Sequence, residues 1–312
     1  IRDSVSIVTP NRSHFDIART FLESGFHVIC DKPMTCTLEE ARILKEIVER
    51  TGRILAVTYT YTGYPMVKQA RHIVQEGFLG DIVKVVAEYR QAWVPRLLDT
   101  KGANRDVWRF DPSKAGISCC IGDIGIHAQN LIQYITGLKI EKICADLFCA
   151  VPEKPLDNDG SILLRFNDGS HGIMHVSQLY SGEENGMNIQ IYGTKQGLSW
   201  RQENPNYLKC MSLHGYSTTY SKGVRGSRVL SEEAVLASRL PLGHPEGFIE
   251  ALANIYLEAF KAMKVKSIAD RRSRTFDYPG VDDGVISMAF IESVIASATS
   301  DDKWTQMIQV ES

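Results

Sequence analysis

The sequence predicts an α/β plus α+β fold: a doubly wound parallel sheet, followed by a domain with a large, mostly antiparallel open sheet. Over residues 5–57, short apolar runs alternate with amphipathic segments, which is typical of buried strands and the helices that cover them. Over residues 140–212, strand-like runs follow one another closely and are separated by turns. The length of 312 residues is enough for two domains.

In the first part, the apolar runs predict strands at residues 5–8, 27–30 and 53–57. Ser13 is expected to cap the first intervening helix, and Gly25 to end it. Thr37 and Glu40 form a capping box for the second helix, which Gly52 ends. Because the connections are short, the three strands are expected to lie parallel.

In the second part, alternating runs separated by turns such as that at Gly169 predict the sheet. Strands are expected at residues 82–88, 140–149, 159–167, 170–178, 187–193, 196–201 and 206–212. Helices are expected at residues 65–76, 123–136, 246–264 and 281–299, and irregular stretches at 91–116 and 214–240. Residues 1–62 are assigned to the first domain and residues 63–312 to the second, whose C-terminal helix is expected to pack back on the first.

Composition excludes several classes of protein. A net charge of -2 argues against a nucleic-acid partner. No apolar run reaches the roughly 18 residues of a membrane span. The seven cysteines include no CxxC pair, which predicts reduced thiols and a cytoplasmic protein. His171 and His175 are too far apart along a strand to chelate one metal, so no metal site is predicted.

Three residues suggest acid–base chemistry. Asp123 and His127 are four apart at the start of an apolar helix, so they share one face of its first turn. One is suited to orient a substrate hydroxyl and the other to take its proton. Lys32 follows a buried strand, at the sheet edge where ligands gather. The structural alternatives are a helix cap for Asp123, a core histidine for His127 and a loop lysine for Lys32.

The order and spacing of several short motifs resemble those of the glucose-fructose oxidoreductase / inositol dehydrogenase (Gfo/Idh/MocA) family. The resemblance covers nearly the whole chain. The matching residues are Thr9-Pro10-Asn11, His14, Asp31-Lys32-Pro33, Trp108-Arg109, Asp123, His127, Gly243-His244-Pro245-Glu246-Gly247 and Asp282-Asp283-Gly284.

The resemblance implies a partial Rossmann-type sheet, NAD or NADP as the cofactor, and a sugar or cyclic, inositol-like polyol as the small-molecule substrate. It also implies a homodimer or homotetramer that assembles through the large sheet. Lys32, Asp123 and His127 are then the catalytic residues. The cofactor-binding residues would be Thr9, Pro10, Asn11, His14, Asp31, Lys32, Pro33, Trp108 and Arg109.

Two departures from the family pattern stand out. No GxGxxG motif occurs in the chain, and such glycines let the backbone approach a pyrophosphate. We therefore expect that the family's N-terminal Gly-rich βαβ segment is missing before Ile1, which leaves the choice between NAD and NADP open. Second, Ser118-Cys119-Cys120 stands where many relatives have consecutive glycines, and these side chains would narrow the space beside the nicotinamide.

The favoured function is an oxidoreductase that transfers a hydride between NAD(P) and a carbinol of a sugar or polyol. One alternative is a non-catalytic protein of the same fold that senses a dinucleotide or a sugar. Another is an enzyme that recycles its NAD during elimination or glycoside cleavage. Net reduction of the cofactor distinguishes the favoured dehydrogenase from the cofactor-recycling enzyme, which shows none.

Overall fold

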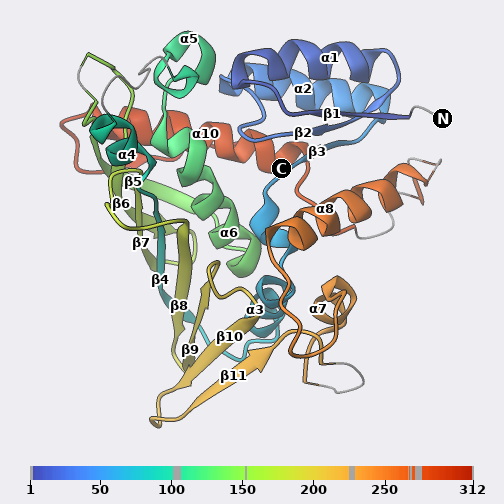
Figure 1. Cartoon of the computed structure of the whole chain (residues 1–312), viewed down its shortest axis with the longest axis vertical. Coiled ribbons are helices and arrows are strands. Elements are labelled where there is room, and N and C mark those ends of the chain that lie inside the picture. The colour runs from blue at the N-terminus through green and yellow to red at the C-terminus, as the bar shows by residue number, and fades with distance from the viewer. Residues whose placement is uncertain are drawn as a thin grey trace.

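The computed structural model describes residues 3–100, 107–151, 153–224, 229–265, 267, 269–270 and 276–310. Its smaller sheet has three parallel strands in the order β1 (Ser4–Ile7), β2 (His27–Cys30) and β3 (Leu55–Val57). Helices α1 (His14–Glu23) and α2 (Leu38–Thr51) lie together over one face of this sheet (Figure 1). The predicted parallel arrangement is confirmed.

Both faces of this sheet are covered, which explains its continuous apolar strands. Val28 and Cys30 belong to the core cluster that contains Leu22 of α1. Ile29, between them in sequence, packs in a separate cluster with Ala259 of α8 (Phe248–Met263). Because neighbouring side chains of a strand point to opposite faces, each residue of β2 meets one of the two helical layers.

The ends of the first two helices follow the sequence signals only in part. Gly25 ends α1 with a φ of 87°, a left-handed value that suits glycine. Ser13 makes no side-chain cap, because its hydroxyl donates to Thr9 and Pro10 instead, so that prediction is wrong. Thr37 does cap α2 by accepting a hydrogen bond from the Glu40 amide.

The larger sheet has nine strands in the order β11-β10-β9-β8-β4-β7-β6-β5-β12. Among the described strands of this sheet, only β4 and β7 pair in parallel. The predicted open, mostly antiparallel sheet is confirmed. The strands are β4 (Ile82–Arg90), β5 (Ile140–Phe148), β6 (Asp159–Phe166), β7 (His171–Ser177), β8 (Gly186–Gly193), β9 (Gln196–Arg201), β10 (Tyr207–Ser212), β11 (Ser217–Ser221) and β12 (Thr305–Gln306).

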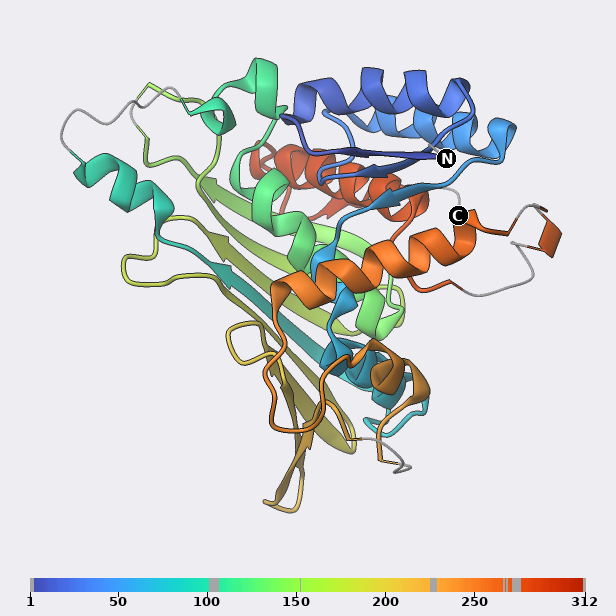
Figure 2. The same cartoon turned by 45° about the vertical axis from the view of Figure 1, so that its right-hand side comes forward.

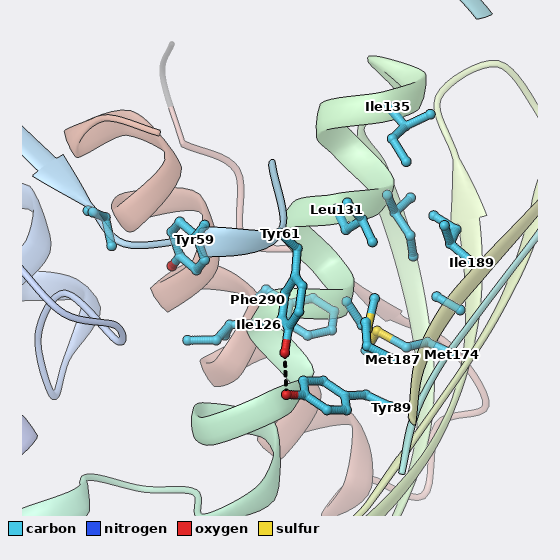
Figure 3. Close-up of a cluster of buried hydrophobic side chains, with 14 of the residues drawn as sticks. Tyr59, Tyr61, Tyr89, Ile126, Leu131, Ile135, Met174, Met187, Ile189 and Phe290 are labelled. Atoms are coloured by element: carbon cyan, nitrogen blue, oxygen red, sulfur yellow. Dashed lines mark hydrogen bonds between the residues drawn. The ribbon is translucent and has the colours of Figure 1, made fainter. Parts of the chain in front are cut away.

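Three helices cover the inner face of this sheet: α3 (Pro65–Gln75), α6 (Ile126–Thr136) and α10 (Val281–Ala298) (Figure 2). In the core, Leu131 of α6 and Phe290 of α10 lie close to side chains of the strands (Figure 3). Helix α10 contacts both α2 and β5, so it joins the two sheets. The two layers of strands therefore share one main core.

Two stretches expected to be irregular contain regular elements. Residues 91–116 include α4 (Trp93–Asp99) and α5 (Pro112–Ala115), and the Asp111 side chain caps α5. Residues 214–240 include β11 and α7 (Glu232–Ala237). Strand β11 is polar because it lies at an edge of the sheet, so it lacks the alternation that marks a buried strand. In the part of the chain that is described, every helix is too short or too polar to cross a lipid bilayer.

Candidate active site

Lys32 lies at the carboxyl end of β2, where the chain leaves the smaller sheet. The carboxylate of Asp31 fixes this turn. Its Oδ1 accepts hydrogen bonds from the backbone amide of Lys32 at 2.9 Å and from the hydroxyl of Thr58 at 2.7 Å. Thr58 directly follows β3, so Asp31 links the ends of two strands. The lysine is thus held at the edge where ligands of parallel sheets gather.

Asp123 and His127 stand on either side of an irregular helical turn. Ile121–Gly125 form a single π-helical turn, η4, in which the Ile126 amide donates to the Ile121 carbonyl. Helix α6 begins only after it, so the expectation of a regular first turn containing Asp123 and His127 is wrong. Such turns are frequent at functional sites.

Asp157, in the loop before β6, explains this geometry. Its two carboxylate oxygens accept hydrogen bonds from the amides of Cys119 and Ile121, both at 2.9 Å. Its backbone carbonyl accepts a third from the amide of Cys120 at 3.0 Å. Three consecutive amides are therefore satisfied from outside the helix, and the chain enters η4 along a fixed path.

The side chains of Lys32 and Asp123 form an ion pair with an Nζ–Oδ1 distance of 2.8 Å, and they are 15% and 18% exposed. The guanidinium of Arg109 lies 3.4 Å from the other carboxylate oxygen, which also accepts a hydrogen bond from Gln178 at 3.2 Å. Burial alone would raise the pKa of Asp123, but Lys32 and Arg109 outweigh it and lower the pKa to about 2. Asp123 is therefore a carboxylate at neutral pH.

His127 is buried on α6, with 7% of its surface exposed. Its ring makes an edge contact with the ring of Tyr61, at 4.9 Å between centroids. Burial and the nearby charge of Lys32 hold its pKa well below the usual value. Its Nδ1 has no hydrogen-bond partner among the described residues. The imidazole is thus neutral at pH 7, and its Nδ1 is buried without a partner among those residues.

Lys32, Asp123 and His127 line one cavity of about 660 Å³, which we call the Lys32 cavity. It lies between the end of the smaller sheet and the inner face of the larger one. Its wall also contains Tyr61 and Tyr89, whose hydroxyls point toward one another and form a hydrogen bond (Figure 3). An ammonium, a carboxylate and a neutral imidazole therefore face the same space.

A smaller cavity of about 210 Å³, the Thr9 cavity, adjoins it. The two cavities share Asp31, Lys32, Arg109 and Asp123. All the expected cofactor-binding residues except His14 line the Thr9 cavity: Thr9, Pro10, Asn11, Asp31, Lys32, Pro33, Trp108 and Arg109. The guanidinium of Arg109 stacks on the indole of Trp108 at 4.6 Å.

His14 is fully buried behind this wall. Its two ring nitrogens lie 2.8 Å from the carbonyl oxygens of Pro33 and Thr9. It therefore braces the two loops and does not itself line the Thr9 cavity. Asn11 plays a similar part on the other side, because its side chain donates to the carbonyl of Ala115 at 2.9 Å.

Ser118 and Cys119 line the Thr9 cavity, as expected for side chains that narrow it. Cys120 is fully buried and lies outside that lining. The Ser118 hydroxyl accepts a hydrogen bond from the amide of Gly122 at 3.1 Å, so it is held within the turn that leads to Asp123.

Several polar residues of the site carry no signal in the sequence. Asn185 lies in a loop before β8 and bonds both tyrosines: Tyr89 donates to it at 2.7 Å, and it donates to Tyr61 at 3.3 Å. Gln178 reaches Asp123 from the end of β7.

Comparison with known proteins bears on this site. A model described as an oxidoreductase family with an NAD-binding Rossmann fold matches residues 2–59. The model of the GFO/IDH/MocA C-terminal domain matches residues 67–199. An uncharacterized oxidoreductase, YfiI of Bacillus subtilis, is 32% identical over 97% of this chain and 77% of its own length. The chain belongs to the Gfo/Idh/MocA oxidoreductase family.

Solved structures of the family share this fold. The inositol dehydrogenase homolog of Azotobacter vinelandii, complexed with NAD+, has a TM-score of 0.89 at 31% identity, over 97% of this chain and 78% of that one. Among the sequence relatives, a levoglucosan dehydrogenase of Pseudarthrobacter phenanthrenivorans is 27% identical over 70% of this chain and 61% of its own length.

Membership of the Gfo/Idh/MocA family confirms the predicted fold and the expectation of NAD or NADP as the cofactor. The Rossmann model matches from residue 2, so the expected absence of the family's N-terminal Gly-rich segment is not confirmed.

Proposed function

We propose that this protein is an NAD(P)-dependent dehydrogenase that oxidises a carbinol of a sugar or cyclic polyol. The observation that carries the proposal is the Lys32 cavity, in which the ammonium of Lys32, the carboxylate of Asp123 and the imidazole of His127 face one space. The names of the relatives described above, which include a levoglucosan dehydrogenase and an inositol dehydrogenase homolog, support this class of substrate.

The Thr9 cavity suits one end of the cofactor. At about 210 Å³ it is smaller than the roughly 300–1,000 Å³ of pockets that hold a whole drug-sized ligand, so it suits the nicotinamide and not the entire dinucleotide. Thr9, Pro10 and Trp108 would form its walls. When bound, the cofactor supplies a hydride acceptor, and the rest of the chemistry depends on this chain's own residues.

His127 would take the proton of the substrate hydroxyl, because its ring is neutral and lines the Lys32 cavity. Lys32 would stabilise the negative charge that develops on the same oxygen and hold the cofactor's ribose. Asp123 would orient the hydroxyl and also fix Lys32, with which it is paired at 2.8 Å. The three groups would thereby hold the alcohol in a reactive orientation.

A homo-oligomer through the larger sheet fits its outward face. Leu163, Ile173 and Tyr192 point away from the core and are 42%, 38% and 38% exposed. Exposed apolar side chains grouped on one sheet face favour contact with a second copy. Light scattering of the purified protein tests this, and a monomer at all concentrations would contradict it.

The function is tested by incubating the protein with NAD or NADP and a panel of sugars and cyclic polyols. The expected result is reduced cofactor, with a binary complex detected by quenching of tryptophan fluorescence. If the protein does not bind the dinucleotide and reduces it with no member of the panel, the proposal is contradicted. Consumption of a sugar without net reduction would indicate a cofactor-recycling reaction instead.

A further inference from the structure

A further cavity of about 610 Å³ lies beside the Lys32 cavity, and we call it the Gln202 cavity. The two share Asn185 and Phe248 in their walls. The rings of Tyr61 and Tyr64 stack between them with centroids 6.3 Å apart, Tyr61 on the side of the Lys32 cavity and Tyr64 on that of the Gln202 cavity. The two cavities therefore adjoin one another at Asn185 and Phe248.

One wall of the Gln202 cavity is held by a buried ion pair and its hydrogen bonds. Lys222 and Glu246 form an ion pair of 2.6 Å, and both side chains are only 2% exposed. The Glu246 carboxylate also accepts hydrogen bonds from the amides of Arg239 and Leu240. Asn206 bonds both the amide and the carbonyl of Glu246. Such a fully satisfied network fixes the loop ahead of α8 without any ligand.

The inner surface of the cavity combines amides with aromatic rings. Gln202 donates to the hydroxyl of Tyr64 at 3.4 Å, and its Oε1 is buried without a partner within the described part of the chain. Phe248 and Tyr207 each leave 46% of their surface exposed at the rim. Amides suit hydroxyl groups, and flat aromatic faces suit the C–H faces of a saccharide ring.

The charge of this lining selects against anions. Glu184 and Glu203 are exposed carboxylates, and none of the described lysines or arginines pairs with either. Of the described residues that line the cavity, Lys222 alone carries a lysine or arginine charge, and Glu246 neutralises it. A phosphate placed here would meet two negative charges and no free cation.

We propose that the Gln202 cavity is a second subsite, which binds a neutral saccharide unit joined to the ring whose carbinol lies in the Lys32 cavity. The substrate is then a glycoside of at least two rings, in preference to a free monosaccharide or a sugar phosphate. This inference rests on the proposed function, because it extends the same site. The cavity residues that contact the second ring are Gln202, Asn204 and His244.

The test compares neutral disaccharides, the matching monosaccharides and their phosphates with the protein and two variants. Binding is measured by saturation-transfer NMR and titration calorimetry, and turnover by cofactor reduction. The expected result is tighter binding of disaccharides, which Gln202→Ala weakens about tenfold with little change for monosaccharides. The control Gln75→Ala removes an exposed amide at the end of α3 and leaves both unchanged.

A charge-reversal variant gives an independent reading. Glu184→Lys places a cation at the rim and should raise the affinity for phosphorylated sugars severalfold. Equal binding of one-ring and two-ring sugars, or a preference of the unmodified protein for phosphates, would overturn the subsite and leave the proposed function standing. Gln202-dependent disaccharide binding without any cofactor reduction would contradict the proposed function and support the subsite.

Discussion

The Nζ of Lys32 lies 2.8 Å from the Oδ1 of Asp123 and 2.5 Å from its backbone carbonyl oxygen, although the two residues are 91 positions apart in the chain. One follows β2 of the smaller sheet, and the other lies in η4 before α6. This contact connects the two parts of the molecule at the point where both cavities meet. Both side chains are mostly buried, so each depends on the other for compensation of its charge.

Replacement of Lys32 by Met should lower both stability and activity. The Asp123 carboxylate would lose its closest cation, and a buried carboxylate that loses its partner costs about 3–5 kcal/mol. Urea unfolding should show this loss, and kcat should fall about 10²-fold or more. Lys209→Met, at an exposed position of β10, is the matched control and should change neither. Wild-type stability of Lys32→Met would refute the pairing.

Asp123 should make stability depend on pH in the acid range. Its pKa is lowered from 3.8 to about 2 in the folded protein. A carboxyl group whose pKa is lower in the folded state than in the unfolded state stabilises the fold at pH values above its unfolded-state pKa. This stabilisation is lost as the pH falls toward the folded-state pKa. The contribution is on the order of 2 kcal/mol at neutral pH. Asp123→Asn should therefore be less stable at about pH 6, and its deficit should shrink toward about pH 3.

Urea midpoints at the two pH values measure this deficit. Asp302→Asn removes an exposed carboxylate and serves as the control. A deficit of Asp123→Asn that stays constant between the two pH values would show that the carboxylate has no such role.

The activity should persist in mildly acid solution. The base-competent form of His127 is the neutral ring, which exists above its pKa, and burial holds that pKa well below the usual 6.5. The acid limb of the kcat profile should therefore lie below pH 6.5, provided that saturating cofactor is present. A limb with an apparent pKa at or above 6.5 would contradict a buried, neutral His127.

Gly63 tests how closely the segment after β3 packs against α8. Its backbone approaches α8 so tightly that a Cβ would lie 2.1 Å from the carbonyl oxygen of Ala251. The Gly63 carbonyl also accepts a hydrogen bond from Asn254 at 3.0 Å. Gly63→Ala should cost about 1–3 kcal/mol of unfolding free energy. Gly280→Ala, where a Cβ meets nothing closer than 4.0 Å, should be tolerated, and equal thermal shifts would count against this packing.

Much of the fold and part of the site follow from local sequence patterns. The apolar runs around β1 to β3 and the turns between later strands predicted both sheets. This is possible because a strand buried on one face or on both faces has a characteristic spacing of apolar residues. Lys32, Asp123 and His127 were also predicted to act together, and the structure places all three in the wall of one cavity. Strand β11 was missed because its residues are polar, and an edge strand does not need an apolar face.

The rest of the site depends on contacts between distant segments. Asp157 accepts a hydrogen bond from the amide of Ile121 in η4, although it lies 36 residues further along the chain. The sequence around Ile121 itself contains no pattern that predicts a π-helical turn. Asn185 joins Tyr61 and Tyr89 from a loop before β8. Such partners are fixed by the tertiary fold, so only the structure reveals them.

In the proposed reaction, His127 accepts the proton of an alcohol held by Lys32 and Asp123. The most direct measurement is the rate of cofactor reduction by His127→Gln, with dinucleotide affinity determined on the same preparation. The expected result is unchanged dinucleotide binding and a rate about 10²–10⁴-fold below that of the unmodified protein. Reduction at the unmodified rate by a folded, cofactor-binding His127→Gln would contradict it.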